Sequence, residues 1–216
     1  MTPPVSTPRP DKRRALLDGA LAVFARDGYT RASIDTIAQE AGVSTRTIYN
    51  HFGDKATLFR AVIVDSAERT AERQIGAARW LLGKITDLEK DLIGFGMAWA
   101  TPDAESAQHF ALVRQIAADA GHLPAEAIDA WQQAGPLRVQ TEIAAHLRSI
   151  ANAGLLIIDD EMLAANQLVQ LTAGSVHPLP VQTDITVKDV ELIVHSGVRV
   201  FLAAYQRQRP LGDPPT

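Results

Sequence analysis

Residues 33–59, SIDTIAQEAGVSTRTIYNHFGDKATLF, decide the fold. Ser33 and Ser44 each precede a short amphipathic stretch, as helix N-cap residues do, and Gly42 lies between the stretches where a tight turn is needed. Asp54 precedes a third, longer stretch. The pattern predicts a helix-turn-helix, a motif whose second helix enters the major groove of DNA.

Composition narrows the class of protein. The chain has 216 residues and no cysteine, so disulfides and thiolate metal sites are excluded and a reducing compartment is expected. No apolar run approaches the roughly 18 residues of a membrane span, and the N-terminal charges precede no apolar signal segment. We therefore expect a cytoplasmic protein with no membrane partner.

Charge is unevenly distributed along the chain. Residues 1–60 carry nine Lys or Arg against six Asp or Glu, while the remainder carries 12 basic against 19 acidic residues. A basic segment on an acidic body suits a protein that touches a polyanion with one end, although a bias of this size also arises by chance.

Helical periodicity extends over nearly the whole sequence, so we expect an all-α protein of nine or ten helices. Short strand-like runs occur only at 155–159 and 181–187. The expected domains are a Pro-rich disordered tail at 1–9, a three-helix DNA-binding domain at 10–56, an effector-binding and dimerisation domain at 57–209, and a second tail at 210–216. The expected helices lie at about 11–27, 34–41, 45–52, 55–79, 84–100, 102–121, 124–134, 136–153, 160–173 and 187–209.

The predicted recognition helix begins after Ser44. Ile48 and Phe52 would face inward at i, i+4 spacing, which leaves the first turn to contact bases. An arginine there can pair with guanine, and a threonine methyl can contact thymine. The residues expected to read bases are Thr45, Arg46 and Thr47.

Phosphate contacts are expected beside this turn. Hydroxyl, amide and imidazole groups follow it on the helix, and Lys55 begins the next helix, where the dipole also favours an anion. The expected phosphate contacts are Ser33, Ser44, Tyr49, Asn50, His51 and Lys55. The alternatives are simpler: the serines are caps only, Tyr49 packs on the domain, and Arg46 and His51 are solvated surface groups.

A family resemblance rests on these residues. Segment 13–59, with ALLDGALAVFARDGYTRAS, IDTIAQEAGVSTRTIYNHF and GDKATLF, resembles the DNA-binding domain of the TetR (tetracycline-repressor) family of transcriptional regulators. The aromatic after the first glycine (Tyr29), the IA..AGVS core, the YNHF end and the following lysine all match. Residues 109–171 more weakly resemble the C-terminal domain of the AefR-like subgroup.

The resemblance implies a homodimeric, ligand-responsive repressor that binds a palindromic operator on double-stranded DNA. It assigns the first turn of the recognition helix to bases and its flanks to phosphates. A basic arm before the first helix would add backbone or minor-groove contacts, or would only aid solubility. The candidate arm residues are Arg9, Lys12, Arg13 and Arg14.

A broad apolar stripe marks the last helix, and Gly197 would allow another helix to approach closely. We expect it to form a four-helix dimer interface with the preceding helix, as the family resemblance also implies; the alternative is intramolecular core. The expected interface residues are Leu163, Leu168, Val190, Val194, Gly197, Val198, Phe201 and Tyr205, flanked by Val169, Leu171, Ile193 and Leu202.

A ligand pocket is expected among large side chains of the central helices. The candidates to line it are Trp80, Phe95, Met97, Trp99, Phe110, Arg114, Trp131, Met162 and His177, with Gln115 and Gln140 as further polar groups. For each large apolar side chain of this set, plain core packing is the alternative interpretation. For the polar members Arg114, Gln115, Gln140 and His177, the alternative is a surface or interhelix position.

Other functions lack support in the sequence. No histidine pair has metal-ligand spacing on a helix, and GxSxG, GxGxxG and phosphate-loop motifs are absent, so we expect no enzyme, no cofactor and no metal. The acidic run at 159–161 is explained by helix capping. The first alternative is a DNA-binding regulator that answers to a protein partner and has no small-molecule pocket, and a more remote one is an all-α enzyme.

Overall fold

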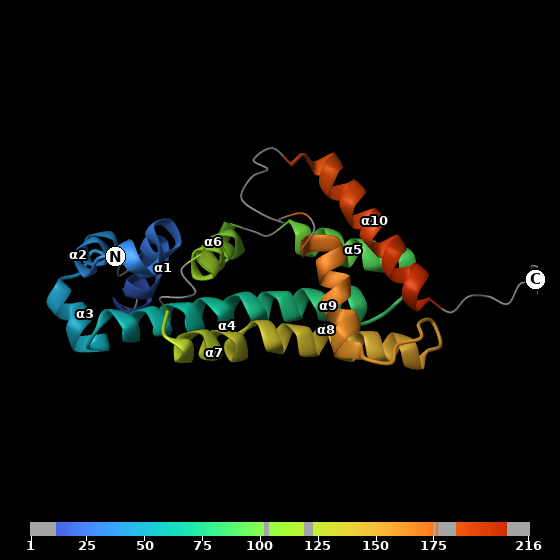
Figure 1. The fold of residues 1–216 in the computed structure, drawn as a ribbon, viewed down its shortest axis with the longest axis horizontal. Coiled ribbons are helices and arrows are strands. Elements are labelled where there is room, and N and C mark those ends of the chain that lie inside the picture. The colour runs from blue at the N-terminus through green and yellow to red at the C-terminus, as the bar shows by residue number, and fades with distance from the viewer. Residues whose placement is uncertain (1–11, 102–103, 119–122, 175, 177–184, 207–216) are drawn as a thin grey trace, which may run out of the picture. The chain divides into compact units, whose positions relative to one another are not determined.

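The computed structural model describes residues 12–101, 104–118, 123–174, 176 and 185–206. The described residues are helical with short connections, which confirms the all-α prediction (Figure 1). Packing divides the chain into two compact units. The first comprises residues up to 70 together with 104–136, and the second comprises 71–103 together with 137 onward.

The first unit contains α1 (Lys12–Arg31), α2 (Ile34–Glu40), α3 (Thr45–Phe52), the first part of α4 (Lys55–Leu82), α6 (Ala104–Ala118) and α7 (Ala125–Ala134). Helix α1 packs on α2 and α6. The core is aliphatic and aromatic, and its largest fully buried members are Phe24, Phe59, Leu16, Leu17, Leu21, Ile37, Ile48, Leu58 and Ile63. Packing thus places α6 and α7 with the helix-turn-helix, while the boundary expected at residue 56 stays a prediction.

Side-chain caps start the short helices of this unit. The Ser33 hydroxyl accepts a hydrogen bond from the Thr36 amide, and the Ser44 hydroxyl accepts one from the Thr47 amide. The Asp54 carboxylate accepts one from the Thr57 amide at 2.7 Å. These bonds satisfy amides that would otherwise lack partners, so each helix begins at a defined residue.

Helix α1 is bent at Gly28, whose φ of 76° and ψ of 170° lie outside the helical region. The sequence predicts that α1 ends here, and Gly28 does end its regular part. One further helical turn, Tyr29–Arg31, follows the bend before α2 begins. The Gly28 carbonyl oxygen accepts the amide of Ala32 at 3.2 Å, which continues the chain towards α2.

The second unit contains the rest of α4, α5 (Leu88–Ala100), α8 (Pro136–Asn152), α9 (Glu161–Val169), a π-helical turn η2 (Gln170–Gly174) and α10 (Val187–Tyr205). Helix α10 packs on α5, η2 and α9. Ion pairs Arg79–Glu142 and Arg138–Glu72 join α4 to α8. The centre of this core holds Leu92, Phe95, Leu147, Leu168, Val194, Val198 and Phe201.

Several expected boundaries are corrected by the structure. Helix α5 starts at Leu88 because Asp87 caps it, and the amide and hydroxyl of Thr101 bond the Met97 carbonyl at its end. Thr101 therefore caps the end of α5. Pro102, where the next helix was expected to begin, lies outside the described residues. The helix expected at 160–173 becomes π-helical after Val169. Helix α10 ends at Tyr205, where Gln206 forms a β-bridge with Leu156.

Candidate nucleic-acid interface

Helix α3 exposes one side and buries the other. Ile48 is 1% exposed and belongs to the core of the first unit, whereas Arg46, Tyr49 and Asn50 are exposed. The last three are spaced i, i+3 and i+4, so they share one helix face. The buried residue and the Ser44 cap hold the helix, and the exposed face presents a guanidinium, a phenol and an amide.

The three residues expected to read bases are not equivalent. Arg46 is exposed, while Thr45 and Thr47 are half-buried. The Thr47 hydroxyl lies 2.9 Å from the Ser44 hydroxyl and shares a hydrogen bond with it. Arg46 is therefore the member of the three with an extended polar group on the surface, and Thr47 takes part in the cap.

The expected phosphate contacts on these helices are accessible. Tyr49 is 52% exposed, and Asn50 and His51 are also exposed. Ser33 is exposed at the start of α2, where its hydroxyl lies 2.8 Å from the Thr36 hydroxyl. Both serines therefore act as caps in the free protein, and their contact with phosphate stays a prediction.

Lys55 lies at the N-terminus of α4. Its ammonium is 4.7 Å from the centroid of the Tyr29 ring and 3.4 Å from the carbonyl oxygen of Thr30. Burial of the side chain lowers the pKa of this lysine below its ordinary value. The helix start and the ammonium together provide a positive site.

One of the four residues expected to form a basic arm is held within the fold instead. Arg9 lies outside the described residues, and Lys12 and Arg13 are exposed at the start of α1. Arg14 is held by two carboxylates: its guanidinium donates to Asp18 at 2.8 Å and to Asp65 at 2.7 Å. We therefore correct its assignment from the DNA arm to a contact between α1 and α4.

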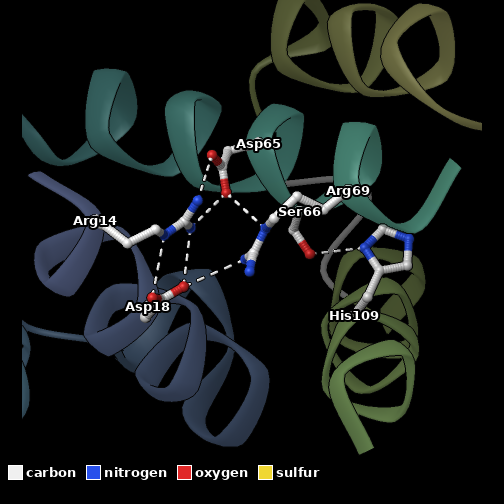
Figure 2. Close-up of polar contacts among 6 residues, drawn as sticks. All are labelled: Arg14, Asp18, Asp65, Ser66, Arg69 and His109. Carbon is white, nitrogen blue, oxygen red and sulfur yellow. Dashed lines mark hydrogen bonds and ion pairs between the residues drawn. The ribbon is translucent and has the colours of Figure 1, made fainter. Parts of the chain in front are cut away.

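Figure 2 shows the polar cluster to which Arg14 belongs. Arg69 completes it, with contacts of 3.1 Å to Asp65 and 3.3 Å to Asp18. Two guanidinium groups thus face two carboxylates, and the Asp65 hydrogen bond raises the pKa of Arg14. The same turn of α4 that makes these bonds to α1 also contacts α6, because the Ser66 hydroxyl and the buried His109 Nδ1 lie 2.9 Å apart.

The pocket candidates of the second unit have different surroundings. Phe95 is fully buried and stacks near Trp99, with ring centroids 4.4 Å apart; Met97 is half-buried beside the same core. Trp80 is 83% exposed and Met162 is also exposed. Gln140 donates to the backbone oxygen of Met162. The expectation that Trp80 and Met162 line a pocket is therefore wrong, because both side chains lie at the surface.

The remaining pocket candidates belong to the first unit or lie outside the described residues. Phe110 is half-buried beside His109, with rings 5.4 Å apart, and Trp131 packs against the core. Among the residues that the structure describes, the buried indole nitrogen of Trp131 has no hydrogen-bond partner. Arg114 is exposed, which corrects its expected place in a pocket, and His177 is outside the described residues.

The expected dimer stripe is core within one chain. Val194, Val198 and Phe201 are each 0% exposed and belong to the second unit's hydrophobic cluster. A Cβ at Gly197 would lie 2.0 Å from the backbone oxygen of Leu171, so this glycine admits a neighbour of its own chain. Six residues expected at a dimer interface are therefore buried within one chain instead. They are Leu168, Val190, Val194, Gly197, Val198 and Phe201.

Two expected interface residues remain at or near the surface. Leu163 on α9 is exposed, and Tyr205 is half-buried, with its hydroxyl donating to the Gln167 side chain at 2.6 Å. Sequence reasoning missed the opposite face of α10, where Leu192 and Val200 are exposed at i, i+8 spacing. The sequence held a signal for them, because the apolar residues of this helix cover more of its surface than one neighbouring helix needs.

Two kinds of feature are absent from the described residues. None of the helices in these ranges combines the length and the hydropathy of a membrane span. Among the same residues, no three His, Cys, Asp or Glu side chains gather as a metal-binding group.

Family models match both parts of the chain. Residues 16–62 match a model described as bacterial regulatory proteins, tetR family. Residues 92–207 match a model described as AefR-like transcriptional repressor, C-terminal domain. The second match extends well beyond the region 109–171 in which the sequence showed that resemblance.

Individual relatives agree with these models. The HTH-type transcriptional repressor Rv1474c of Mycobacterium tuberculosis is 36% identical over 77 residues, which cover 36% of this chain and 40% of that repressor. A TetR-family regulator structure from Mesorhizobium loti has a TM-score of 0.79 at 26% identity, over 94% of this chain and 100% of the other. The flavonoid-responsive regulator FrrA has a TM-score of 0.65 at 27% identity, over 92% and 98%.

Proposed function

This chain belongs to the TetR family of DNA-binding transcriptional regulators, which are not enzymes, and we propose that it represses transcription by binding a palindromic operator as a homodimer. The observation that carries the proposal is the outward face of α3. Arg46, Tyr49 and Asn50 are exposed there on a helix fixed by a serine cap and a buried isoleucine.

Each exposed group suits a different part of the operator. The Arg46 guanidinium can donate two hydrogen bonds to the O6 and N7 atoms of a guanine, which is a contact that discriminates between bases. Thr45 and Thr47 would offer methyl groups beside it. Tyr49, Asn50, His51 and Lys55, with Ser33 and Ser44, would bind phosphates and fix the orientation of α3 in the groove.

A second copy of the chain would pack on the outward faces of α9 and α10. Leu163, Leu192 and Val200 are exposed apolar residues of these helices, and a two-fold axis would place each set against its equivalent. Two α3 helices would then be presented to half-sites about 34–36 Å apart, or a multiple of this distance.

We further propose a small apolar or aromatic effector that releases the repressor from DNA. FrrA is named as flavonoid-responsive. In this chain α5 carries the fully buried Phe95 and the half-buried Met97 and Trp99, apolar side chains that an effector entering the core of the second unit would contact. An effector that binds better to a dimer with wrongly spaced recognition helices would lower operator occupancy by shifting the population towards that state.

One observation favours a second mode of control. Trp80 is 83% exposed on α4, and tryptophan is enriched at protein–protein interfaces. The alternative proposal is that a protein partner controls DNA binding through this surface and that no effector pocket exists.

Selection of operator sequences from a randomised DNA duplex pool tests the main proposal, because the pool contains every candidate half-site. We expect the full chain to enrich a palindrome. Arg46→Ala should weaken binding to it by about 1–3 kcal/mol and relax the preference at one base pair of each half-site.

The matched control is Arg114→Ala, because Arg114 is an exposed arginine on α6 and not on α3. It should leave the enriched sequence unchanged. An Arg46→Ala protein that selects the same palindrome with the same preference at every position would exclude base reading by Arg46.

A further inference from the structure

Lys55 differs in its surroundings from the other lysines. The chain has five, all within the described residues; Lys12, Lys84, Lys90 and Lys188 are exposed, and Lys55 is half-buried. Its ammonium lies over the face of the Tyr29 ring, at 4.7 Å, and donates to the carbonyl oxygen of Thr30. Two consecutive residues of one short turn thus hold the end of this side chain.

The Tyr29 ring is itself fixed by the core. It lies 4.8 Å from the ring of Phe59 and 6.3 Å from that of Phe24, and both phenylalanines are fully buried. The bend at Gly28 turns the chain immediately before Tyr29. The ring face that meets the ammonium is therefore a rigid part of the first unit.

The backbone at Lys55 is equally well defined. Asp54 caps α4 by accepting the amide of Thr57, so the helix starts at a fixed place and Lys55 is its first residue. A free lysine side chain loses much rotamer freedom when it binds a phosphate. A lysine already held by an aromatic face and a carbonyl loses less, and its remaining donors stay available.

We propose that Tyr29 is a positioning residue for DNA binding, whose ring holds the Lys55 ammonium at the start of α4 where a DNA phosphate is bound. The inference rests on the proposed operator binding and deepens it. Tyr29 would act through its aromatic face and not through its hydroxyl.

A double-mutant cycle on the selected operator tests the inference. Tyr29→Leu should weaken binding about two- to fivefold, the range that corresponds to a surface cation–π contact. Lys55→Ala should weaken it for all sequences alike and lower the salt slope by about one per bound recognition helix. In the Lys55→Ala background, Tyr29→Leu should have no further effect, and Tyr29→Phe should bind as the native protein does.

Three results would overturn the inference. A Tyr29→Leu loss of equal size with and without Lys55 would mean that the ring acts only through the fold. A loss in Tyr29→Phe would assign the role to the hydroxyl, and tighter binding by Tyr29→Leu would mean that the ring withholds the ammonium. Lys90→Ala is the matched control, an exposed lysine on α5 that should leave both affinity and salt slope unchanged.

Folding is checked separately by thermal unfolding of each variant. Should Tyr29→Leu fail to fold, Tyr29→Met replaces it in the same cycle, because methionine fills irregular space and lacks the ring. The NMR shifts of the Lys55 ε-methylene protons give a second measurement without DNA: ring-current displacement is expected in the native and Tyr29→Phe proteins and not in Tyr29→Leu. A native chain that selects no DNA sequence would refute the proposed function itself, an outcome distinct from an absent coupling.

Discussion

Gly28 holds a backbone conformation, with φ 76° and ψ 170°, that residues bearing a Cβ rarely adopt. We predict that Gly28→Ala lowers the free energy of unfolding by about 1–3 kcal/mol, the usual range for such strain. Urea unfolding followed by circular dichroism measures the change.

The control for this variant is Gly76→Ala on α4. A Cβ at Gly76 would meet no atom within 4 Å, and the residue is helical. Alanine there should stabilise the chain by about 0.4–1 kcal/mol. A Gly28→Ala protein as stable as the Gly76→Ala protein would refute the strain argument.

The stability of the N-terminus of α4 depends on pH through the Asp54 carboxyl group. The hydrogen bond from the Thr57 amide lowers the pKa of this carboxyl below its ordinary value. Because the folded pKa is the lower one, the stabilisation is present above the unfolded pKa of 3.8 and is lost as the pH falls through the folded value.

We therefore predict that Asp54→Asn, which still caps the helix, loses less stability than the native chain between pH 5 and about pH 2. Thermal unfolding temperatures across this range measure the difference. Parallel pH profiles for the two proteins would show that the Asp54 carboxylate contributes nothing to acid sensitivity.

Individual residues of the site differed in how well the sequence predicted them. Arg46 is placed by the cap and by the buried Ile48, both readable as a local pattern, and it is exposed as expected. Arg14 looked like part of a basic tail, yet its partner Asp65 lies 51 positions away in the sequence. The i, i+4 pairs Arg14–Asp18 and Asp65–Arg69 were visible, but their meeting depends on how α1 packs on α4.

At the scale of elements, the contact between α10 and η2 depends on Gly197, because only a residue without a side chain fits there. A Cβ at Gly197 would lie 2.0 Å from the Leu171 carbonyl oxygen, which belongs to backbone and cannot rotate away. We predict that Gly197→Ala costs about 1–3 kcal/mol of unfolding free energy by overpacking, despite the higher helix propensity of alanine.

Chemical denaturation measures this cost, and Gly76→Ala again serves as the helical glycine without a close neighbour. A second reading comes from hydrogen exchange, in which amides of η2 and α10 should lose protection together. Stabilisation by Gly197→Ala would mean that the helix and the π-helical turn separate at little cost.

In the helix-turn-helix segment, helix starts were easier to predict than helix ends, whereas the start of α5 at Leu88 was missed. Ser33, Ser44 and Asp54 mark starts, because a cap is a local hydrogen bond that the sequence displays. The bend at Gly28 and the π-helical turn after Val169 depend on tertiary packing. The sequence pattern therefore predicted an end for α1 that is too early and an end for α9 that is too late.

At the scale of the whole molecule, the proposed dimer depends on the outward face of α10. We predict that Leu192→Glu, at a residue 67% exposed, converts the dimer into a folded monomer by burying a charge at the two-fold axis. Sedimentation velocity measures the mass, and operator affinity should fall by about 100-fold or more as the two sites become independent.

Leu137→Glu is the matched control, because Leu137 is an exposed leucine on α8. It should leave the mass and the operator affinity unchanged. A Leu192→Glu protein that remains dimeric would move the interface elsewhere.

The all-α class and the DNA-binding motif were predictable because they rest on local periodicity and spacing. Which apolar residues of α10 are buried within one chain was not predictable, since an apolar stripe on one helix looks the same whether a neighbouring helix or a second chain covers it. Val194 and Leu192 are two positions apart, yet one is core and the other is surface. The pocket prediction failed at Trp80 for the same reason: size and hydrophobicity do not report burial.

The carboxylate partners of Arg14 and Arg26 also bear on how a regulator searches a chromosome. Non-specific affinity for DNA grows with the number of cations that displace counterions from phosphates. Arg14 faces Asp18 and Asp65, and Arg26 faces Asp27 and Glu40, so these two cations of the first unit are already paired with carboxylates of the same chain. We expect brief residence on random sequence as a consequence, with more of the chain's molecules left to sample the genome by free diffusion.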